Sequence, residues 1–396
     1  MILKKSIDNI AFLSTYPPRE CGLATFTQDL INSIDDIGIV NTNVIAIKNS
    51  KKNVYDSKVF AEIRQNELED YIKTAKRLNA SNIDLLVIEH EYGIFGGEYG
   101  DYILKLVEKL EIPIITTLHT ILSKPDFKQR LIINILGKKS VKIITMAKNT
   151  KKILQKTYGI DSRKIEVIHH GVPRKLIISK ESAKKKYGYE NTQIVSTFGL
   201  IGPGKGIEHA IEAISEVVKT QKDLIYLILG QTHPALKDKG RTYRNKLEKQ
   251  VKRLNLGENV KFINKYLSKD EIIQYLQLSD IYMTPYLNVD QAVSGTLAYA
   301  VGYGKAIVST PYLYAKEMLA DGRGVLAEFN NVGSLVNGLK HILQNPDEKV
   351  NMEKTTIKMG RTMYWEIVAQ KYNEVFLNSI NSYANAKLVS SDIEVV

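Results

Sequence analysis

One glycine-rich segment in the second half of the chain has the composition of an anion-binding turn. It spans residues 199–206, and it follows a short apolar run and precedes a helical pattern. Backbone N–H groups of Gly202, Gly204 and Gly206, together with the ammonium group of Lys205, could hold phosphate oxygens there. The glycine spacing is neither that of a P-loop nor that of a dinucleotide fingerprint. A flexible loop with a solvated lysine would show the same pattern, so spacing alone leaves both interpretations open.

A second segment, residues 291–304, also lies between an apolar run and a helical pattern. Ser294 is a good helix N-cap, and Gly295 lets a ligand or another backbone approach closely. A helix that begins here would present unpaired N–H groups and a positive dipole end, which suits a pyrophosphate. An ordinary strand-to-helix turn with small packing residues would look the same, and the spacing favours neither interpretation.

Polar residues also follow several apolar runs in the first half of the chain. His90, His119 and His170 each stand at the carboxyl end of an expected strand, where ligands bind in open parallel sheets. That position favours a functional role over a structural one. The pair His90 and Glu91 has no third ligand at suitable spacing, so we expect no metal site. A Gly-x-Ser-x-Gly elbow is absent, and a hydrolase triad therefore lacks support.

The first expected strand is followed by a short loop, residues 16–25, that contains Arg19 and Gly22. Gly22 stands at the turn into the next helical pattern. We expect this loop to point toward the same sheet edge as the histidines.

The segments that position these residues alternate between short apolar runs and longer amphipathic ones. Such alternation predicts parallel sheets with helices on both faces. Expected strands are residues 10–13, 43–47, 83–89, 112–118, 141–146, 165–169, 194–198, 224–229, 260–263, 281–285 and 306–310, and expected helices include 26–34, 68–78, 102–110, 150–158, 207–218 and 365–377. Ser268 and Glu271 form a capping-box signature for a further helix that ends near residue 278.

The alternation pauses in a polar, basic stretch, so we expect two α/β domains joined by a linker. The expected boundaries are an N-terminal domain at 1–178, a linker at 179–191, a C-terminal domain at 192–365, and a helix with a polar tail at 366–396 that packs back on the first domain. Each domain would be a doubly wound, Rossmann-like parallel sheet. The carboxyl ends of the two sheets would face each other across a cleft that holds the ligand.

Composition and charge narrow the classes of protein that fit. The chain has 396 residues, 44% hydrophobic and 25% charged, which suits a globular protein of two domains. A single cysteine, no signal-peptide pattern and no apolar run of 18 residues lead us to expect a cytoplasmic protein. The net charge of +12 fits a lysine-rich solvated surface, an anionic ligand or an anionic membrane. Nucleic acid is the weakest explanation, because no nucleic-acid-binding motif is present.

Taken in order, these landmarks resemble the family-4 retaining glycosyltransferases of the GT-B fold, over residues 10–376. His170-Gly171-Val172 looks like the family's Asn-Gly-Val, and Lys205-Gly206 is similar to its phosphate-binding Lys-Gly. The sequence departs from the family at three positions. Gln291 and Tyr299 stand where the family has two glutamates, and Leu200 stands where it has an arginine. We interpret the chain as a member of a variant subgroup with this Gln/Tyr pair.

The resemblance implies an enzyme that moves a hexosyl group from a UDP- or GDP-sugar to a hydroxyl of a saccharide or lipid-linked acceptor. Transfer would retain configuration and need no metal or other cofactor. His119, Lys205 and Gln291 would be catalytic. The donor-binding residues would be Gly22, His170, Gly171, Gly202, Gly204, Gly206, Ser294, Gly295, Thr296, Tyr299 and Glu317, and the acceptor would meet Arg19, His90 and Glu91.

Two alternatives fit the same sequence. A nucleotide-sugar 2-epimerase of this fold would need carboxylates for proton abstraction, which Gln291 and Tyr299 do not supply. A non-catalytic nucleotide-sugar-binding partner in envelope polysaccharide synthesis is favoured by the missing glutamates and arginine, whereas Lys205 and His119 weigh against it. The basic surface also leads us to expect peripheral contact with the inner face of a membrane.

Overall fold

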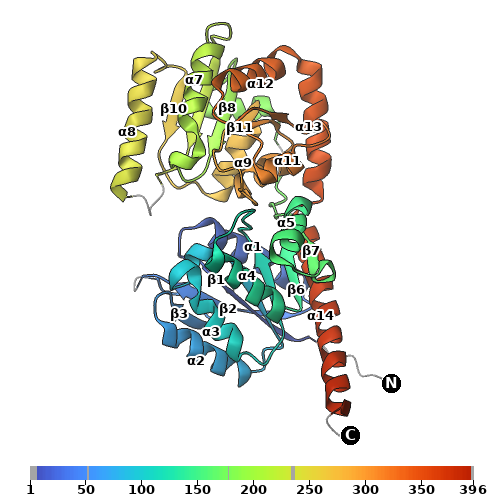
Figure 1. The fold of residues 1–396 in the computed structure, drawn as a ribbon. Helices are drawn as coiled ribbons and strands as arrows, with labels where there is room; N and C mark the ends of the chain where they lie inside the picture. Colours follow the sequence, from blue (N-terminus) through green and yellow to red (C-terminus); the bar gives the residue numbers. More distant parts are fainter. Residues whose placement is uncertain (1–6, 51–52, 177, 233–236, 394–396) are drawn as a thin grey trace. The chain divides into compact units, whose positions relative to one another are not determined.

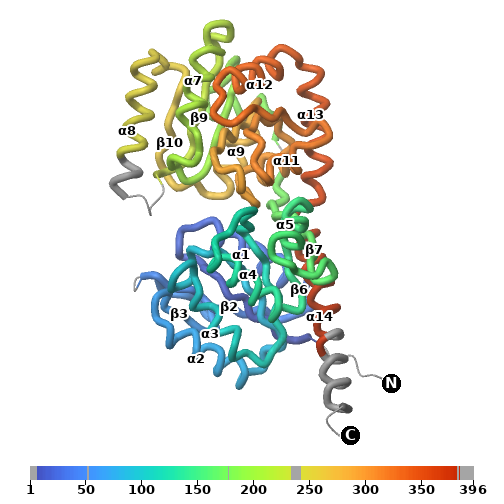
Figure 2. Tube along the Cα trace, in the orientation of Figure 1, coloured from blue at the N-terminus to red at the C-terminus, as the bar shows by residue number. Residues whose placement is uncertain are grey.

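The computed structural model of the chain describes residues 7–50, 53–176, 178–232 and 237–393. The chain forms two compact units (Figures 1 and 2). Unit 1 comprises residues 1–171 and 365–396, and unit 2 comprises residues 172–364. The chain therefore enters unit 2 after Gly171 and returns to unit 1 after Tyr364.

Unit 1 is built on a seven-stranded sheet in which every neighbouring pair is parallel. Its strand order is β3-β2-β1-β4-β5-β6-β7. The central strands are buried on both faces, as continuous apolar runs require in a sheet covered by helices. The strands are β1 (Asn9–Ser14), β2 (Asn41–Lys48), β3 (Val59–Arg64), β4 (Leu85–His90), β5 (Ile114–Leu118), β6 (Lys142–Thr145) and β7 (Ile165–Val167).

The helices of unit 1 connect successive strands, and the last helix of the chain packs on this unit. They are α1 (Gly22–Ile37), α2 (Leu68–Asn79), α3 (Tyr102–Lys109), α4 (Phe127–Lys139), α5 (Lys148–Tyr158) and α14 (Trp365–Ile393), with short 3-10 turns η1 (Tyr92–Ile94), η2 (Glu98–Gly100) and η3 (Ser162–Lys164). In α14, Phe376 meets Phe12 of β1 edge to face, with ring centroids 6.2 Å apart. Aromatic packing thus anchors the returning helix to the sheet.

Unit 2 repeats the plan with a six-stranded sheet in the order β10-β9-β8-β11-β12-β13, again with parallel pairs. Its strands are β8 (Gln193–Phe198), β9 (Leu224–Leu229), β10 (Val260–Ile263), β11 (Ile281–Thr284), β12 (Ala306–Ser309) and β13 (Val325–Leu326). Its helices are α6 (Lys180–Tyr187), α7 (Ile207–Val217), α8 (Lys237–Arg253), α9 (Lys269–Leu278), α10 (Gly295–Gly302), α11 (Leu313–Met318), α12 (Val332–Gln344) and α13 (Pro346–Arg361), with the 3-10 turn η4 (Pro203–Lys205).

Each sheet has one point where the strand order reverses. In unit 1, β1 lies between β2 and β4, and in unit 2, β8 lies between β9 and β11. The loops that leave β1 and β4 therefore diverge at the carboxyl edge of the first sheet, and those that leave β8 and β11 diverge in the second. In open α/β sheets this switch point is where ligands bind.

The predicted α/β class with parallel, doubly wound sheets is confirmed. Every strand expected from the sequence has a counterpart, and the capping box of Ser268 and Glu271 opens α9 as expected. Two strands were not anticipated. Edge strand β3 has only two buried residues and β13 has only two residues in all, so neither produces a buried apolar run.

Two stretches to which the sequence assigned no regular structure are helical. The stretch 179–191, expected to be a linker, contains α6, which begins at Ser179 as N-cap and ends before Gly188 in the left-handed conformation. The expected polar tail continues α14 as far as Ile393. No helix among residues 7–50, 53–176, 178–232 and 237–393 combines the length and apolarity needed to cross a membrane.

Candidate functional site

The loop after β8 comes close to neighbouring backbone at some of its glycines. Gly199 has φ of 130° and Gly206 has φ of 61°, values that side-chain-bearing residues rarely adopt. A Cβ atom on Gly206 would lie 2.0 Å from the carbonyl oxygen of Pro285, so only glycine fits there. Gly202 is extended and precedes η4. A Cβ atom on Gly204 would meet nothing within 4 Å. The loop is thus closed against β11 at Gly206 and open at Gly204.

Lys205 has few partners within the protein. Its Nζ lies 3.8 Å from the centre of the Tyr286 ring. No hydrogen bond or ion pair of this ammonium group occurs among the described residues. A lysine ammonium carries three donor hydrogens, so its hydrogen-bonding capacity is available to a ligand.

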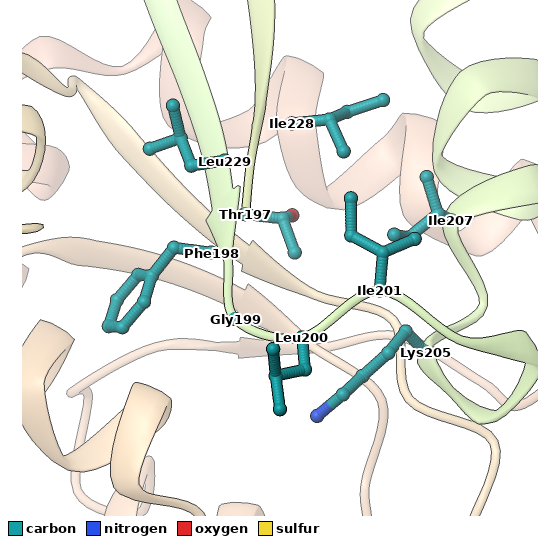
Figure 3. A pocket seen from close by; sticks show the side chains of 9 residues that line it. All are labelled: Thr197, Phe198, Gly199, Leu200, Ile201, Lys205, Ile207, Ile228 and Leu229. Atoms are coloured by element: carbon teal, nitrogen blue, oxygen red, sulfur yellow. The ribbon is translucent and has the colours of Figure 1, made fainter. Parts of the chain in front are cut away.

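A small pocket beneath this loop has Lys205 as the one charged member of its lining, as Figure 3 shows. Leu200, the position where the resemblance led us to expect an arginine, lines the same pocket. The other lining residues are apolar, apart from Thr197 and the backbone of Gly199. The pocket itself is therefore mostly apolar, and Lys205 supplies the one charged group in its lining.

Helix α10 begins as the sequence predicts. Ser294 is its N-cap, and its Oγ accepts a hydrogen bond from Leu297 N–H at 3.3 Å and lies 3.1 Å from Thr296 Oγ1. The first N–H groups of a helix have no acceptor within the helix, so those of Gly295 and Thr296 are available in the way the sequence suggested. Together with the helix dipole they favour an anion at this end of the helix.

The structure brings the two expected anion-binding segments together, although they are about 90 residues apart in the chain. A Cβ atom on Gly199 would lie 3.2 Å from Thr296 Cγ2. The Tyr286 hydroxyl lies 2.8 Å from Thr296 Oγ1, while the ring of the same tyrosine contacts Lys205. Leu287 N–H donates to Gly204 O at 3.1 Å. One tyrosine at the end of β11 thus touches both segments.

Three further donor-side candidates lie around the same strand ends in unit 2. Gln291 Nε2 donates to Val293 O at 3.1 Å, and Gln291 O accepts from Tyr314 N–H at 3.0 Å, so this residue supports the turn into α11. Tyr299 is buried, and its ring meets Phe198 edge to face at 6.2 Å. Glu317 lies in α11, where its carbonyl accepts from Arg323 Nη2 at 2.9 Å.

In unit 1, His119 is paired with a carboxylate. Its Nε2 lies 2.7 Å from Glu89 Oε2, and Glu89 is fully buried at the end of β4. Thr117 Oγ1 donates to Glu89 Oε1 at 3.3 Å and lies 3.2 Å from the Tyr372 hydroxyl of α14. A carboxylate accepts hydrogen bonds, so the pair holds the proton of His119 on Nε2 and leaves Nδ1 as the other polar atom of the ring.

An aromatic cluster holds His119 beside His170. The ring of Phe26, in the second turn of α1, meets His119 at 4.8 Å, His170 at 5.0 Å and Trp365 at 5.2 Å. His170 Nδ1 lies 2.6 Å from Gly171 O, and burial lowers the pKa of His170 to about 4. A Cβ atom on Gly171 would lie 2.1 Å from the Trp365 ring, so close packing against this ring requires a glycine at position 171.

The loop after β1 and the turn after β4 have contacts of their own. Cys21 caps α1 by accepting from Ala24 N–H, and a Cβ atom on Gly22 would meet nothing within 4 Å. Arg19 Nη1 donates to Gln65 Oε1 at 3.3 Å, and Gln65 Nε2 donates to Gly93 O at 3.2 Å. Gln65 thus links the two loops at the switch point of the first sheet.

The two remaining acceptor candidates differ in accessibility. Glu91 is half-buried and accepts from Tyr92 N–H and Thr120 Oγ1. His90 is fully buried against Phe95 and Tyr92, and burial lowers its pKa to about 3. Neither ring nitrogen of His90 has a hydrogen-bond partner in the described part of the chain. As placed here, His90 offers no surface to an acceptor.

Four residues that organise these sites had no role assigned from the sequence: Glu89, Phe26, Trp365 and Tyr286. A glutamate inside an otherwise apolar strand was a usable signal, because a buried carboxylate needs a partner. The aromatic residues gave none, because nothing in their spacing distinguishes them from ordinary core residues. In the described residues, no group of three or more His, Cys, Asp or Glu side chains is arranged to hold a metal ion.

Sequence models of two glycosyltransferase families match the chain. The model described as Glycosyltransferase Family 4 matches residues 58–176, and the model described as Glycosyl transferases group 1 matches residues 179–359. A Methanocaldococcus jannaschii protein named as an uncharacterized glycosyltransferase is 24% identical over 261 residues, 64% of this chain and 63% of that protein. The 2-deoxystreptamine glucosyltransferase of Streptomyces kanamyceticus is 24% identical over 215 residues, 52% of this chain and 51% of that enzyme. The chain thus spans about half to two thirds of the length of these curated relatives.

Solved structures share the fold along almost the whole chain. Sucrose-phosphate synthase from Thermosynechococcus elongatus superposes with a TM-score of 0.77 at 15% identity, covering 93% of this chain and 98% of that one. HepE of Anabaena, solved in complex with UDP-glucose, gives a TM-score of 0.73 at 15% identity, with 93% and 99% covered. The predicted GT-B fold class is confirmed by this likeness. The sequence matches make both units of the chain similar to glycosyltransferases.

Proposed function

We propose that the protein transfers a hexosyl group from a UDP- or GDP-sugar to an acceptor hydroxyl, with retention of configuration and without a metal ion. The observation that carries the proposal is the convergence in unit 2 of Lys205, the glycine loop and the start of α10 around Tyr286. The family matches and the solved complex of HepE with UDP-glucose support the same donor chemistry.

In unit 2, the groups around Tyr286 would bind the donor diphosphate and stabilise it as it leaves. Negative charge develops on the diphosphate as the glycosidic bond breaks, and preorganised donors aimed at that charge stabilise the transition state. Each well-placed donor contributes roughly 3–4 kcal/mol in comparable sites. Lys205 and the N–H groups of Gly202, Gly204 and Gly206 would act from one side, and Ser294, Gly295 and Thr296 from the helix start.

The remaining donor-side roles rest on the resemblance. Gln291 would bind sugar hydroxyls, while Tyr299 and Glu317 would orient the nucleotide or sugar. In unit 1, His119 would contact the donor sugar at the reacting carbon, held in place by Glu89. Gly22, His170 and Gly171 would complete the donor-binding set, and Gly22 has open space around it.

The acceptor would be a saccharide or a lipid-linked saccharide. Arg19 and Glu91 are the residues of unit 1 that we propose for acceptor contact, since both are at least partly accessible. A lipid-linked acceptor would agree with a cytoplasmic protein that binds the membrane surface peripherally. The net charge of +12 supports attraction to an anionic surface.

The test is transfer and donor hydrolysis by the purified protein with a panel of UDP- and GDP-sugars. We expect one class of donor to be consumed, and consumption to continue in millimolar chelator. Lys205→Ala should lower the rate at least 100-fold while leaving the melting temperature unchanged. Lack of consumption of every donor by a folded protein would overturn the proposal.

A non-catalytic sugar-nucleotide-binding protein is a second candidate. The observation that favours it is the pocket of Figure 3, where Leu200 leaves Lys205 as the one charged lining residue. Calorimetry combined with the transfer and hydrolysis assay separates the two candidates. Binding of a nucleotide sugar with neither transfer nor hydrolysis would support this second function.

A further inference from the structure

Tyr286 holds an unusual position between the two anion-binding segments of unit 2. It directly follows β11 and Pro285, and its side chain is fully buried. The face of its ring contacts the ammonium group of Lys205, and its hydroxyl contacts the hydroxyl of Thr296. A residue that touches both segments can fix their separation.

The contact with the ring restricts Lys205. A lysine side chain has four rotatable bonds and loses much conformational entropy when it is ordered. The ammonium group lies 3.8 Å from the ring centre, within the range in which the quadrupole of an aromatic face attracts a cation. Because no carboxylate of the described chain pairs with Lys205, the ring orders the charge without neutralising it.

Tyr286 is itself held firmly. Its ring stacks on Tyr312, with centroids 5.4 Å apart and an interplanar angle of 18°. Its carbonyl accepts a hydrogen bond from Thr310 Oγ1 at 2.5 Å, and the next residue, Leu287, donates its N–H to Gly204 O. A side chain fixed by stacking and by backbone contacts can serve as a rigid support.

We propose that Tyr286 is a positioning residue for the diphosphate of the donor. Its ring holds the Lys205 ammonium group, and its hydroxyl holds Thr296 at the start of α10, so that both segments present their donors to one diphosphate. Tyr286 acts through these two residues and does not itself touch the ligand. The inference rests on the proposed function, because it assumes that a nucleoside diphosphate binds here.

The experiment is a double-mutant cycle measured as affinity for UDP and GDP by calorimetry. Tyr286→Leu removes the ring face and the hydroxyl, and Lys205→Met removes the cation. We expect Tyr286→Leu to weaken binding about 5- to 30-fold in the wild-type background. In the Lys205→Met background the same change should weaken binding by a smaller factor, about 3- to 10-fold, because only the contribution of the hydroxyl through Thr296 remains.

A second cycle uses smaller changes and covers the case in which Tyr286→Leu does not fold. Tyr286→Phe keeps the ring on Lys205 and removes the hydroxyl from Thr296. We expect it to weaken binding about 3- to 10-fold alone and to have no further effect in the Thr296→Val background. Thermal unfolding of every variant confirms that the compared proteins are folded.

The outcomes distinguish failure of the positioning role from failure of the proposed function. If the wild-type protein binds a nucleoside diphosphate and both cycles are additive, Tyr286 is only a structural residue and this inference is overturned while the proposed function stands. If the folded wild-type protein binds neither UDP nor GDP, both are overturned. Non-additivity in either cycle, in the direction given above, supports the positioning role.

Discussion

His119 and Glu89 form a pair in which an imidazole Nε2 lies 2.7 Å from a fully buried carboxylate oxygen. The backbone of His119 is tied to the same strand end, because its N–H donates to His90 O at 3.0 Å. Ring and backbone of His119 are therefore both fixed by β4. A histidine fixed in this way presents one tautomer, which a residue that contacts a reacting sugar requires.

From this pair we predict that Glu89→Gln lowers the rate of transfer and that the variant still folds. Glutamine keeps the shape of the side chain but removes the charge that supports the Nε2 proton. Hydrogen bonds to charged groups contribute about 1.5–3 kcal/mol, so we expect a loss of roughly 10- to 100-fold in kcat/KM. The matched control is Glu62→Gln, which removes a half-exposed ion pair with Lys48 in the same sheet and should leave transfer unchanged. Equal rates for Glu89→Gln and the wild type would remove Glu89 from the mechanism.

The glycine loop offers a stability test with an internal control. Gly206→Ala places a Cβ atom 2.0 Å from Pro285 O at a residue with φ of 61°. The clash and the left-handed conformation should together cost at least about 1–2 kcal/mol. Gly204→Ala places its Cβ atom in open space and should change the free energy of unfolding by less than about 0.5 kcal/mol. Denaturant titration of both variants checks the difference, and equal stabilities would show that the approach to Pro285 is not tight.

Much of the fold could be predicted because both sheets consist of strands buried on both faces. Such strands appear in the sequence as apolar runs, and β9 and β10 have the expected ends. Edge strand β3 could not be found in this way, because only two of its six residues are buried. Helix α6 was hidden by its composition: six of its eight residues are polar or charged, and it buries only Ala183.

The site could be predicted only in part, and for a similar reason. Glycine spacing and N-cap chemistry are local, so the segments with Lys205 and Ser294 could be chosen from the sequence alone. The contact that joins them depends on β8 lying beside β11, which is a property of the sheet order. Tyr286 could not be distinguished from the other fully buried tyrosines around it, such as Tyr282 and Tyr312.

Acid stability of unit 1 should depend on His90. Burial lowers the pKa of His90 to about 3 in the folded chain, against an ordinary value near 6.5. Between these values the unfolded chain binds more protons, so stability falls as pH decreases from 6.5, by up to about 1.4 kcal/mol per pH unit. His90→Phe keeps the packing on Phe95 and removes both unpaired nitrogens. We expect denaturant titration to show a smaller loss of stability between pH 7 and 4.5, and an unchanged loss would contradict this account.

The stability of unit 2 at alkaline pH should depend on Lys305. This lysine precedes β12 and is buried, with Nζ donating to Ser279 O at 3.1 Å. Burial lowers its pKa to about 7. The unfolded chain therefore binds more protons between pH 7 and 10.5, and stability should rise with pH there, by up to about 1.4 kcal/mol per pH unit.

The groups that face Lys305 modify this trend without reversing it. Asp280 pairs with Lys184 at 2.6 Å and with Lys349 at 3.1 Å, and Lys180 pairs with Glu353 at 3.3 Å. Burial lowers the pKa of Lys349, which adds to the effect, whereas the two carboxylates raise the pKa of Lys180 and oppose it.

Substitution isolates the contribution of Lys305 from that of its neighbours. Lys305→Met keeps most of the buried chain and removes the titrating amine, so its free energy of unfolding should rise less than that of the wild type between pH 7 and 9.5. Lys261→Met, at a half-exposed lysine paired with Glu258, should keep the wild-type slope. If Lys305→Met also keeps that slope, the amine remains charged in the folded chain, and the convergence of Lys180, Lys184 and Lys349 on Asp280 must tolerate a further buried positive charge.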